Sequence, residues 1–221
     1  MLTLHRAALV LPDPADPTAP SHTDGAVLVR GELVEAVGPY AGLAAAHPEA
    51  RVRDWGDALL TPGLRNPYGH RLLERAYHPD PREGVGDEPV PEGLAGERDE
   101  TRCGASARRG LQRMLGAGVT AVAGPFERAS VRTAVARSGL AVLPGVLPGS
   151  LPEAEVGEEA GAGPLDPLAV LPLAEAVHGR VAVGGRADFA VFAPVPGAPG
   201  GPRAGGCRAT VLAGRLVFRR R

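Results

Sequence analysis

Short β-type segments lie at both ends of this 221-residue chain, and a strand–helix–strand pattern lies between them. The N-terminal β-type segments are Leu2 to Leu11, Ala26 to Val29, Leu33 to Val37 and Val52 to Leu60. The C-terminal ones are Phe189 to Phe192, Ala209 to Leu212 and Arg215 to Phe218. Gly31, in the short gap between two apolar runs, is typical of a hairpin. We expect the two β-rich ends to join in one antiparallel-type sheet around an inserted α/β unit.

The middle of the chain predicts parallel pairing. The expected elements are a helix over Asp99 to Gly116, a strand over Val119 to Ala123, a helix over Glu127 to Arg137 and a strand over Leu140 to Leu147. Links this short between strand, helix and strand indicate a βαβ unit. His78 to Gly96 is expected as a long loop and Gly149 to Pro164 as a linker, and a helix over Pro167 to Val177 would be interrupted at Pro172. The fold class is therefore α/β plus β.

Composition limits the chemistry. With 44% hydrophobic and 22% charged residues, the chain has enough apolar content for a folded core. All 24 basic residues are arginine, which excludes a lysine nucleophile, Schiff base or carbamylated metal ligand. A net charge of −1 gives no case for nucleic acid or an acidic membrane surface as a partner. We interpret Arg219-Arg220-Arg221 as a solvated tail.

Nothing in the sequence predicts export or membrane insertion. Cys103 and Cys207 are far apart and form no CxxC pattern, so we expect ordinary thiols. The first residues lack the apolar core of a signal peptide, and no apolar run approaches the ~20 residues of a membrane span. A cytoplasmic protein is expected.

Three segments carry a family resemblance. The first is Gly25 to Gly38, followed by Leu60-Thr61-Pro62-Gly63-Leu64-Arg65-Asn66-Pro67-Tyr68-Gly69-His70. The second is Val183 to Phe192 with Ala209 to Val217, and the third is Leu115-Gly116-Ala117-Gly118-Val119-Thr120. In their order along the chain they resemble the amidohydrolase superfamily, near imidazolonepropionase and aminodeoxyfutalosine deaminase. The resemblance implies hydrolysis of non-peptide C–N bonds.

The resemblance also implies a domain plan. Residues 1–64 and 183–221 would form the two halves of a composite β-domain, with a metal-binding (β/α)₈ barrel between them. The intervening residues 65–182 fall far short of the ~250 residues that such a barrel takes. We therefore expect residues 65–182 to be a truncated barrel remnant.

The ligand pattern of the family is incomplete in this chain. Hydrolysis in the family uses a divalent metal that lowers the pKa of bound water, held by several N and O ligands. The family motif "TPGLVNxHxH" supplies two histidines spaced one residue apart. Here the first position is Tyr68 and only His70 remains, and no histidine occurs between Pro79 and Val177. His70 is thus the one metal-ligand candidate.

Three interpretations of His70 stay open: a structural histidine, a ligand in a weak or intermolecular metal site, or a contact to another ligand. His78 lies in the nearby loop and could join His70, although a loop histidine near proline is usually exposed. His178 comes too late for a family ligand position, and Asp166 is the only carboxylate near the place of the final Asp. Asp188 matches a structural family position that supports the closing β-turn.

Two principal functions follow. The first is a catalytically degenerate amidohydrolase relative that acts as an accessory or partner-binding protein, as a homodimer or with another protein. A partial parallel sheet leaves an apolar edge that such a partner would cover. The second is an active deaminase or cyclic amidohydrolase whose site is completed by a second subunit. No cofactor is expected in the first case, and a divalent zinc or iron ion is expected in the second. A small-molecule binding module in the old substrate cleft is a further alternative.

Overall fold

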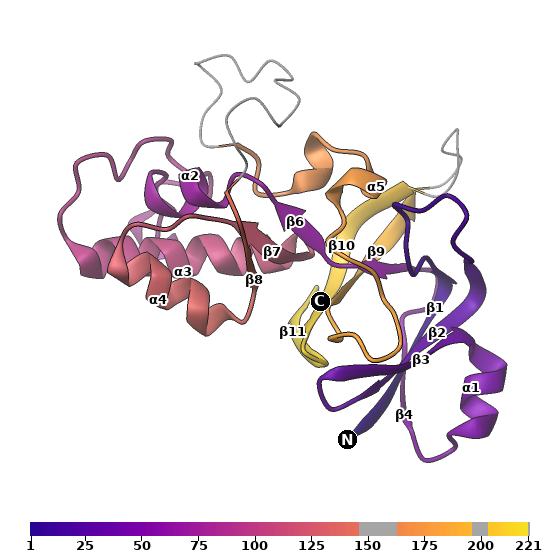
Figure 1. Cartoon of the computed structure of the whole chain (residues 1–221). Coiled ribbons are helices and arrows are strands. Elements are labelled where there is room, and N and C mark those ends of the chain that lie inside the picture. The colour runs from indigo at the N-terminus through magenta and orange to yellow at the C-terminus, as the bar shows by residue number, and fades with distance from the viewer. Residues whose placement is uncertain (146–162, 196–202, 221) are drawn as a thin grey trace.

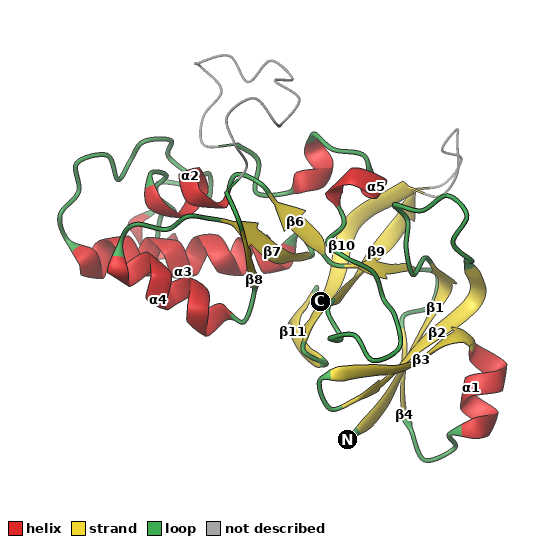
Figure 2. Cartoon of the chain, viewed as in Figure 1, coloured by secondary structure: helices red, strands yellow, loops and turns green. Residues whose placement is uncertain are grey.

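A computed structural model describes residues 1–145, 163–195 and 203–220. Within these residues, strands from both chain ends form one eight-stranded sheet, and a second, three-stranded sheet lies beside it with the helices α2, α3 and α4 (Figures 1 and 2). The predicted combination of an α/β unit with a β-domain is therefore confirmed.

The N-terminal part of the large sheet is built around the first strand. Its elements are β1 (Leu2–Val10), β2 (His22–Arg30), β3 (Leu33–Pro39), α1 (Tyr40–Ala46), β4 (Arg51–Asp54) and β5 (Leu59–Pro62). β1 pairs antiparallel with β2, and β2 pairs antiparallel with β3 through the predicted hairpin. Gly31 in the hairpin turn has a φ of 62°, a conformation that glycine adopts at no steric cost.

The single strand predicted over Val52 to Leu60 is wrong. The chain forms β4 and β5 instead, and both pair with β1 in parallel. Gly56, with a φ of 63°, makes the break, and its N–H donates to Asp54 Oδ1 at 2.8 Å. This local turn is the physical reason why the apolar pattern does not continue as one strand.

The C-terminal strands complete the large sheet. They are β9 (Phe189–Val195), β10 (Arg203–Leu212) and β11 (Arg215–Arg219). β9 pairs antiparallel with β5, so the sheet order is β11-β10-β9-β5-β1-β2-β3, with β4 on β1. The two chain ends therefore meet in one sheet, as the sequence predicted, but this sheet is mixed and not antiparallel throughout, because β4 and β5 pair with β1 in parallel.

The middle of the chain forms the smaller sheet and most of the helices. Its strands are β6 (Leu64–Asn66), β7 (Val119–Ala123) and β8 (Ala141–Leu143), and its helical segments are α2 (Gly69–Glu74), η1 (Pro81–Glu83), α3 (Glu100–Gly116), α4 (Ala129–Ser138), η2 (Pro167–Ala169) and α5 (Leu173–Ala176). β6, β7 and β8 are parallel, which confirms the βαβ unit. The end of the predicted strand, residues 146–147, and most of the predicted linker, residues 149–162, lie outside the described residues.

The helix α3 follows directly from its sequence. Asp99 caps its N-terminus by accepting hydrogen bonds from the N–H groups of Thr101 and Arg102. Cys103, Ala107, Leu111 and Met114 are buried at the spacing of one helical face. Ala107, Leu111 and Met114 enter a hydrophobic core that α4, β7 and parts of β9 and β10 share, while Cys103 packs with Tyr77 and Leu94. The large sheet and the α/β unit are therefore joined through a common core.

Two predicted segments differ in detail. The loop after residue 78 contains η1, and its Leu94 is fully buried while Val90 forms an isolated antiparallel bridge with Tyr77. The helix predicted over Pro167 to Val177 is divided into η2 and α5, because Pro172 lacks the N–H that a continuous helix needs.

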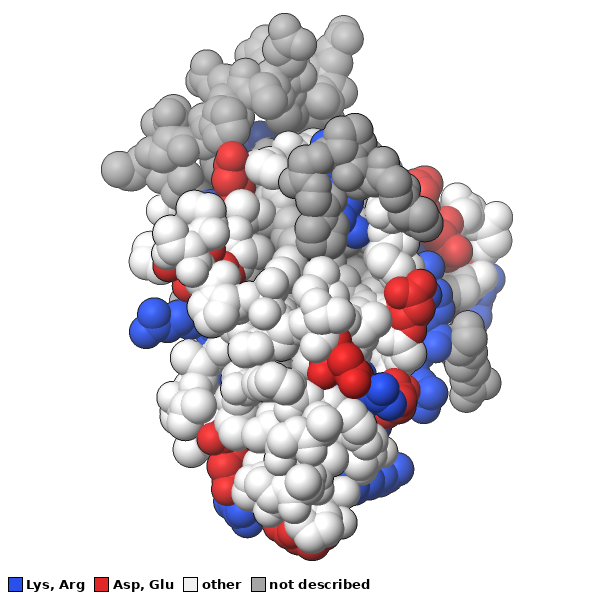
Figure 3. Space-filling model, turned by 90° about the vertical axis from the view of Figure 1, so that its right-hand side faces the viewer, with Lys and Arg blue, Asp and Glu red and all other residues white. Residues whose placement is uncertain are grey.

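The surface gives two further observations. On the face drawn in Figure 3, uncharged side chains cover much of the area, and charged ones lie both at its edges and in one group near its middle. In the described part of the chain, no helix has the length and apolar character needed to cross a membrane.

Candidate functional site

The segment that resembles the family's first metal-binding motif follows β6. Asn66, which is fully buried at the end of β6, accepts a hydrogen bond from the N–H of Tyr68 at 2.9 Å. Its amide nitrogen donates to the carbonyls of Pro164 and Leu165 at 3.0 and 3.2 Å. Asn66 therefore fixes the turn after β6 and ties it to a segment almost a hundred residues later.

Tyr68 occupies the position where the family motif has its first histidine. It lies at the N-cap of α2 and is 9% exposed. A Cβ added to Gly163 would come within 2.6 Å of the Tyr68 ring, so ring and backbone are in direct contact. The phenol position is thus part of the core.

Residues 68 and 70 do not share one direction. A strand would place both on the same face, but the strand ends at Asn66 and α2 begins at Gly69. Positions two apart on a helix are rotated by roughly 200° about its axis. Gly69 permits this early helix, because a Cβ there would come within 2.8 Å of the Ala123 carbonyl on β7.

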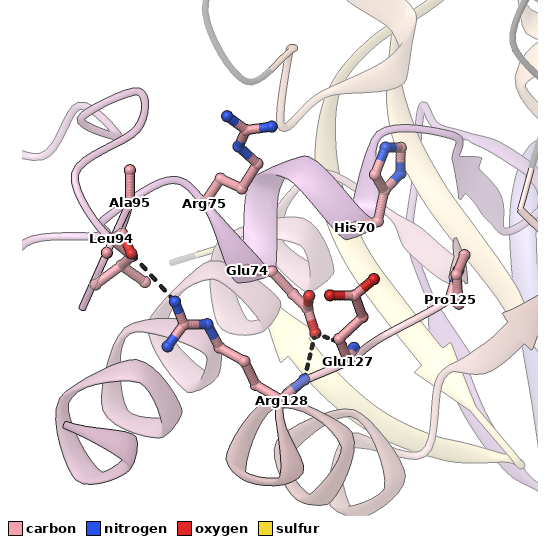
Figure 4. Close-up of a pocket in the computed structure, with 9 residues that line it drawn as sticks. His70, Glu74, Arg75, Leu94, Ala95, Pro125, Glu127 and Arg128 are labelled. Carbon is pink, nitrogen blue, oxygen red and sulfur yellow. Dashed lines mark hydrogen bonds between the residues drawn. The ribbon is translucent and has the colours of Figure 1, made fainter. Parts of the chain in front are cut away.

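His70 lines a cavity of about 460 Å³. Its other lining residues include Glu74, Arg75, Leu94, Glu127 and Arg128. Partial burial, and next the charge of Arg71, lower the pKa of His70, which favours the neutral ring. Its Nδ1 atom is buried without a hydrogen-bond partner among the described residues. Figure 4 shows the ring directed away from the carboxylates of Glu74 and Glu127.

Most charges around this cavity are engaged in holding the fold. Glu74 accepts hydrogen bonds from the N–H groups of Glu127 and Arg128 and so caps the start of α4 (Figure 4). Arg75 forms an ion pair with Glu92 at 2.6 Å.

Arg128 donates to the carbonyls of Leu94 and Glu97 at 3.2 and 2.8 Å. It thereby anchors the segment before α3. The Glu127 carboxylate forms no ion pair within the described ranges.

The described residues do not fit a metal centre of the family type. Across residues 1–145, 163–195 and 203–220, no group of three or more His, Cys, Asp or Glu side chains is placed to hold an ion. His70 has neither a second histidine from residue 68 nor a hydrogen-bonded carboxylate to orient it. In this part of the chain the arrangement provides one imidazole where several ligands are required.

The expectation that His78 is exposed is wrong. His78 is fully buried, and its Nε2 lies 2.8 Å from the Leu72 carbonyl. Because a carbonyl only accepts, Nε2 carries the proton and Nδ1 is left without a partner. The His78 N–H donates to Ser106, and Arg109 donates to the His78 carbonyl at 2.7 Å. His78 therefore secures the contact between α2 and α3 and is held in the core.

The remaining candidates have structural roles. Asp166 caps η2 by accepting from the N–H of Leu168 at 2.9 Å. The N–H of His178 donates to the Gly63 carbonyl at 2.7 Å. Asp188 accepts from the N–H of Ala213 at 2.7 Å in the turn between β10 and β11, as the structural interpretation predicted. Cys103 and Cys207 are buried free thiols whose pKa values burial raises.

Sequence reasoning missed Glu74, Arg75, Glu127 and Arg128 as neighbours of His70. Only Glu74 could have been predicted from the sequence as a neighbour of His70, because it lies four residues after His70 on α2 and so on the same helical face. Glu127 and Arg128 come from the start of α4, so their placement depends on tertiary packing.

Comparison with known proteins supports the resemblance over part of the chain. Residues 25–50 match the family model described as the imidazolonepropionase-like composite domain of bacteria. An imidazolonepropionase from Pyrobaculum arsenaticum is 41% identical over 50 residues, which is 23% of this chain and 13% of that protein. A 5-methylthioadenosine/S-adenosylhomocysteine deaminase from Nitratidesulfovibrio vulgaris is 46% identical over 50 residues, 23% of this chain and 11% of that protein.

Solved structures are similar at a lower level. The match to E. coli guanine deaminase has a TM-score of 0.48 and 16% sequence identity, and it covers 64% of this chain and 35% of the guanine deaminase chain. The match to a zinc-bound adenosine deaminase from Xanthomonas campestris has a TM-score of 0.42 and 23% sequence identity. It covers 64% of this chain and 33% of the adenosine deaminase chain. The chain thus spans about an eighth of the curated relatives that it matches. Over residues 25–50 the chain is therefore similar to the imidazolonepropionase-like composite domain, and its curated relatives over 50 residues are an imidazolonepropionase and a deaminase.

Proposed function

We propose that this chain is a catalytically degenerate amidohydrolase relative that serves as an accessory, partner-binding protein. The observation that carries the proposal is the environment of Tyr68. Its ring lies in the core against Gly163, at the position where the family motif has a metal-binding histidine. His70 alone cannot supply the several ligands that a catalytic zinc or iron ion needs.

The smaller sheet supplies a surface for a partner. In the part of the chain that the structure describes, β8 is the outer strand of the order β6-β7-β8 and pairs only with β7. Val142 on β8 is 55% exposed. An unpaired parallel edge with an apolar side chain favours addition of another chain. We take the first partner to be a second copy, with another protein as the alternative.

Self-association is tested by measuring the mass in solution. The proposal expects about twice the 22.6 kDa of one chain and a crosslinked dimer. Val142→Lys on β8 should shift the mass toward the monomer. Val217→Lys is a matched control, because Val217 is 42% exposed on β11, which belongs to the other sheet. A monomer at all concentrations, or equal effects of the two variants, would argue against the β8 interface.

The rival function is an active deaminase or cyclic amidohydrolase completed by a second subunit. It draws support from the unpartnered Nδ1 of His70 at the cavity wall. Ammonia release from 5-methylthioadenosine and S-adenosylhomocysteine, with zinc or iron added, tests it. Release that disappears in His70→Ala would establish the rival and refute a degenerate site.

Three related assignments belong to the same proposal. Residues 1–64 and 183–221 form a composite domain, and residues 65–182 represent a shortened barrel. The buried, unpaired thiols of Cys103 and Cys207 are consistent with the reducing cytoplasm as its location. The cavity beside His70 is large enough for a small ligand, which thermal shift against purine-like and imidazole-like compounds would detect.

A further inference from the structure

A second cavity, of about 300 Å³, lies on the composite β-domain and shares no lining residue with the one beside His70. It is lined by Asp54, Trp55, Arg208, Arg219 and Arg220. Trp55 follows β4, and the arginines come from β10 and from the end of β11. The two chain ends therefore build this cavity together.

The wall of this cavity carries an excess of positive charge. Asp54 is already engaged, because its Oδ2 accepts from Arg6 at 3.0 Å and its Oδ1 accepts from the Gly56 N–H at 2.8 Å. Arg208, Arg219 and Arg220 form no ion pair within the described residues. Arg6 also pairs with Asp24, so it does not neutralise Asp54, and the three guanidinium groups of the lining exceed its one carboxylate by two charges.

These arginines are held in place. Arg208 donates to the Asp57 carbonyl at 2.6 Å, and the Arg219 guanidinium lies 5.8 Å from the centre of the Trp55 ring. The N–H of Arg220 donates to the Arg208 carbonyl at 2.8 Å, which joins the two backbones across the strands. Arg219 and Arg220 are exposed, but Arg219 belongs to β11 and Arg220 is hydrogen-bonded to β10, so the predicted solvated tail is wrong for these two residues, and residue 221 lies outside the described residues.

Arginines near the cavity add to the repulsion between positive charges. Burial first, and then the charges of Arg51 and Arg219, lower the pKa of Arg53. Arginine side chains that outnumber the single nearby carboxylate repel one another, and a bound anion relieves that repulsion. The guanidinium group matches phosphate oxygens in a bidentate geometry.

We propose that this cavity binds a small phosphorylated compound through its phosphate group, which Arg208, Arg219 and Arg220 hold. The volume is at the lower end of small-molecule sites and suits a compound of that size. The Trp55 ring is already engaged, because its centre lies 6.0 Å from the centre of the His5 ring and the Arg219 guanidinium lies over it. Recognition of the ligand therefore rests on the guanidinium groups. The inference is independent of whether the family metal site is degenerate.

Trp55 is the one tryptophan of the chain, so its fluorescence reports directly on this cavity. The intact protein is titrated with sodium phosphate, sodium pyrophosphate and AMP at constant ionic strength, with sodium sulfate as a further arm. Thermal shift provides a second readout, because a ligand that binds only the folded state raises Tm. We expect a saturable response to pyrophosphate in at least one readout. Saturation by AMP would assign the site to phosphate esters, and saturation by inorganic phosphates alone would assign it to free phosphate.

Variants separate a built site from a generally basic surface. Arg219→Gln and Arg208→Gln should each weaken pyrophosphate binding about tenfold or more, the effect of losing a charged hydrogen bond. Arg215→Gln is the matched control, because Arg215 is exposed on the same strand β11 but does not line the cavity. The proposal is overturned by the absence of a saturable response in both readouts, by equal responses to sulfate and pyrophosphate, or by equal losses in the three variants.

Discussion

The ring of Tyr68 lies against the backbone of Gly163, so that a Cβ on this glycine would come within 2.6 Å of the ring carbon Cγ. Gly163 has a φ of 87°, and the residues after it, Pro164 and Leu165, accept hydrogen bonds from Asn66. The segment after residue 162 therefore covers the position where the family motif has its first histidine.

Gly163→Ala should destabilise the protein by two effects. An alanine at this φ costs about 1–3 kcal/mol, and the contact with Tyr68 adds about 1–3 kcal/mol more. Gly184→Ala separates the two, because Gly184 has a φ of 80° but nothing within 4 Å of an added Cβ. Urea unfolding should show a larger loss of unfolding free energy for Gly163→Ala. Equal losses in the two variants would contradict the packing of Tyr68 against this glycine.

Asp188 should stabilise the turn between β10 and β11 through its carboxylate. Its Oδ1 accepts from the Ala213 N–H, and its Oδ2 lies 2.9 Å from Arg186. Asp188→Ala leaves the Ala213 N–H without this acceptor and should lower the unfolding free energy by about 1–3 kcal/mol. Asp188→Asn keeps an oxygen for Ala213 and should lower it less, as measured by thermal unfolding. If Asp188→Asn lowers the unfolding free energy as much as Asp188→Ala does, the ion pair with Arg186, and not the hydrogen bond to Ala213, carries the contribution of Asp188.

Acid should weaken the fold through buried histidines. Burial lowers the pKa of His78 to about 4, although its hydrogen bond to Leu72 opposes this shift. The unfolded chain, with a His pKa of about 6.5, binds a proton that the folded chain does not bind. Stability from this group is thus lost as the pH falls from about 6.5 to about 4, by about 3 kcal/mol in total. Burial lowers the pKa of His5 to about 3, which acts in the same direction.

The contribution of His78 is measured by urea unfolding between pH 7.5 and pH 4. His78→Gln retains an N–H for the Leu72 carbonyl and cannot be protonated in this range, so its stability should fall less steeply than that of the wild type. His47→Gln, which removes a partly exposed imidazole, controls for the substitution itself. Parallel curves for the wild type and His78→Gln would show that His78 is not the titrating group.

The strands and helices with strong local patterns could be predicted from the sequence. Two elements are determined by residues close together in sequence. One is α3, with its apolar positions Cys103, Ala107, Leu111 and Met114, and the other is the hairpin at Gly31. The break between β4 and β5 could not be predicted from the apolar pattern, because it depends on the turn at Gly56.

The site was harder to predict than the fold. The sequence identified Tyr68 and His70, and a continuous strand would place both side chains on one face. The structure places them at the start of a helix, because β6 ends at Asn66. The burial of His78 depends on contacts with Ser106 and Arg109 on α3, which are 28 and 31 residues away in sequence. Such long-range contacts leave no local pattern in the sequence.

The residues that the structure describes lack the ligand set of a catalytic metal centre. The most direct measurement is the zinc and iron content of the protein, grown with both metals and purified without chelator. We expect far less than one equivalent of either metal per chain, with the same content in His70→Ala. One equivalent of zinc or iron in the wild type that is lost in His70→Ala would contradict the account.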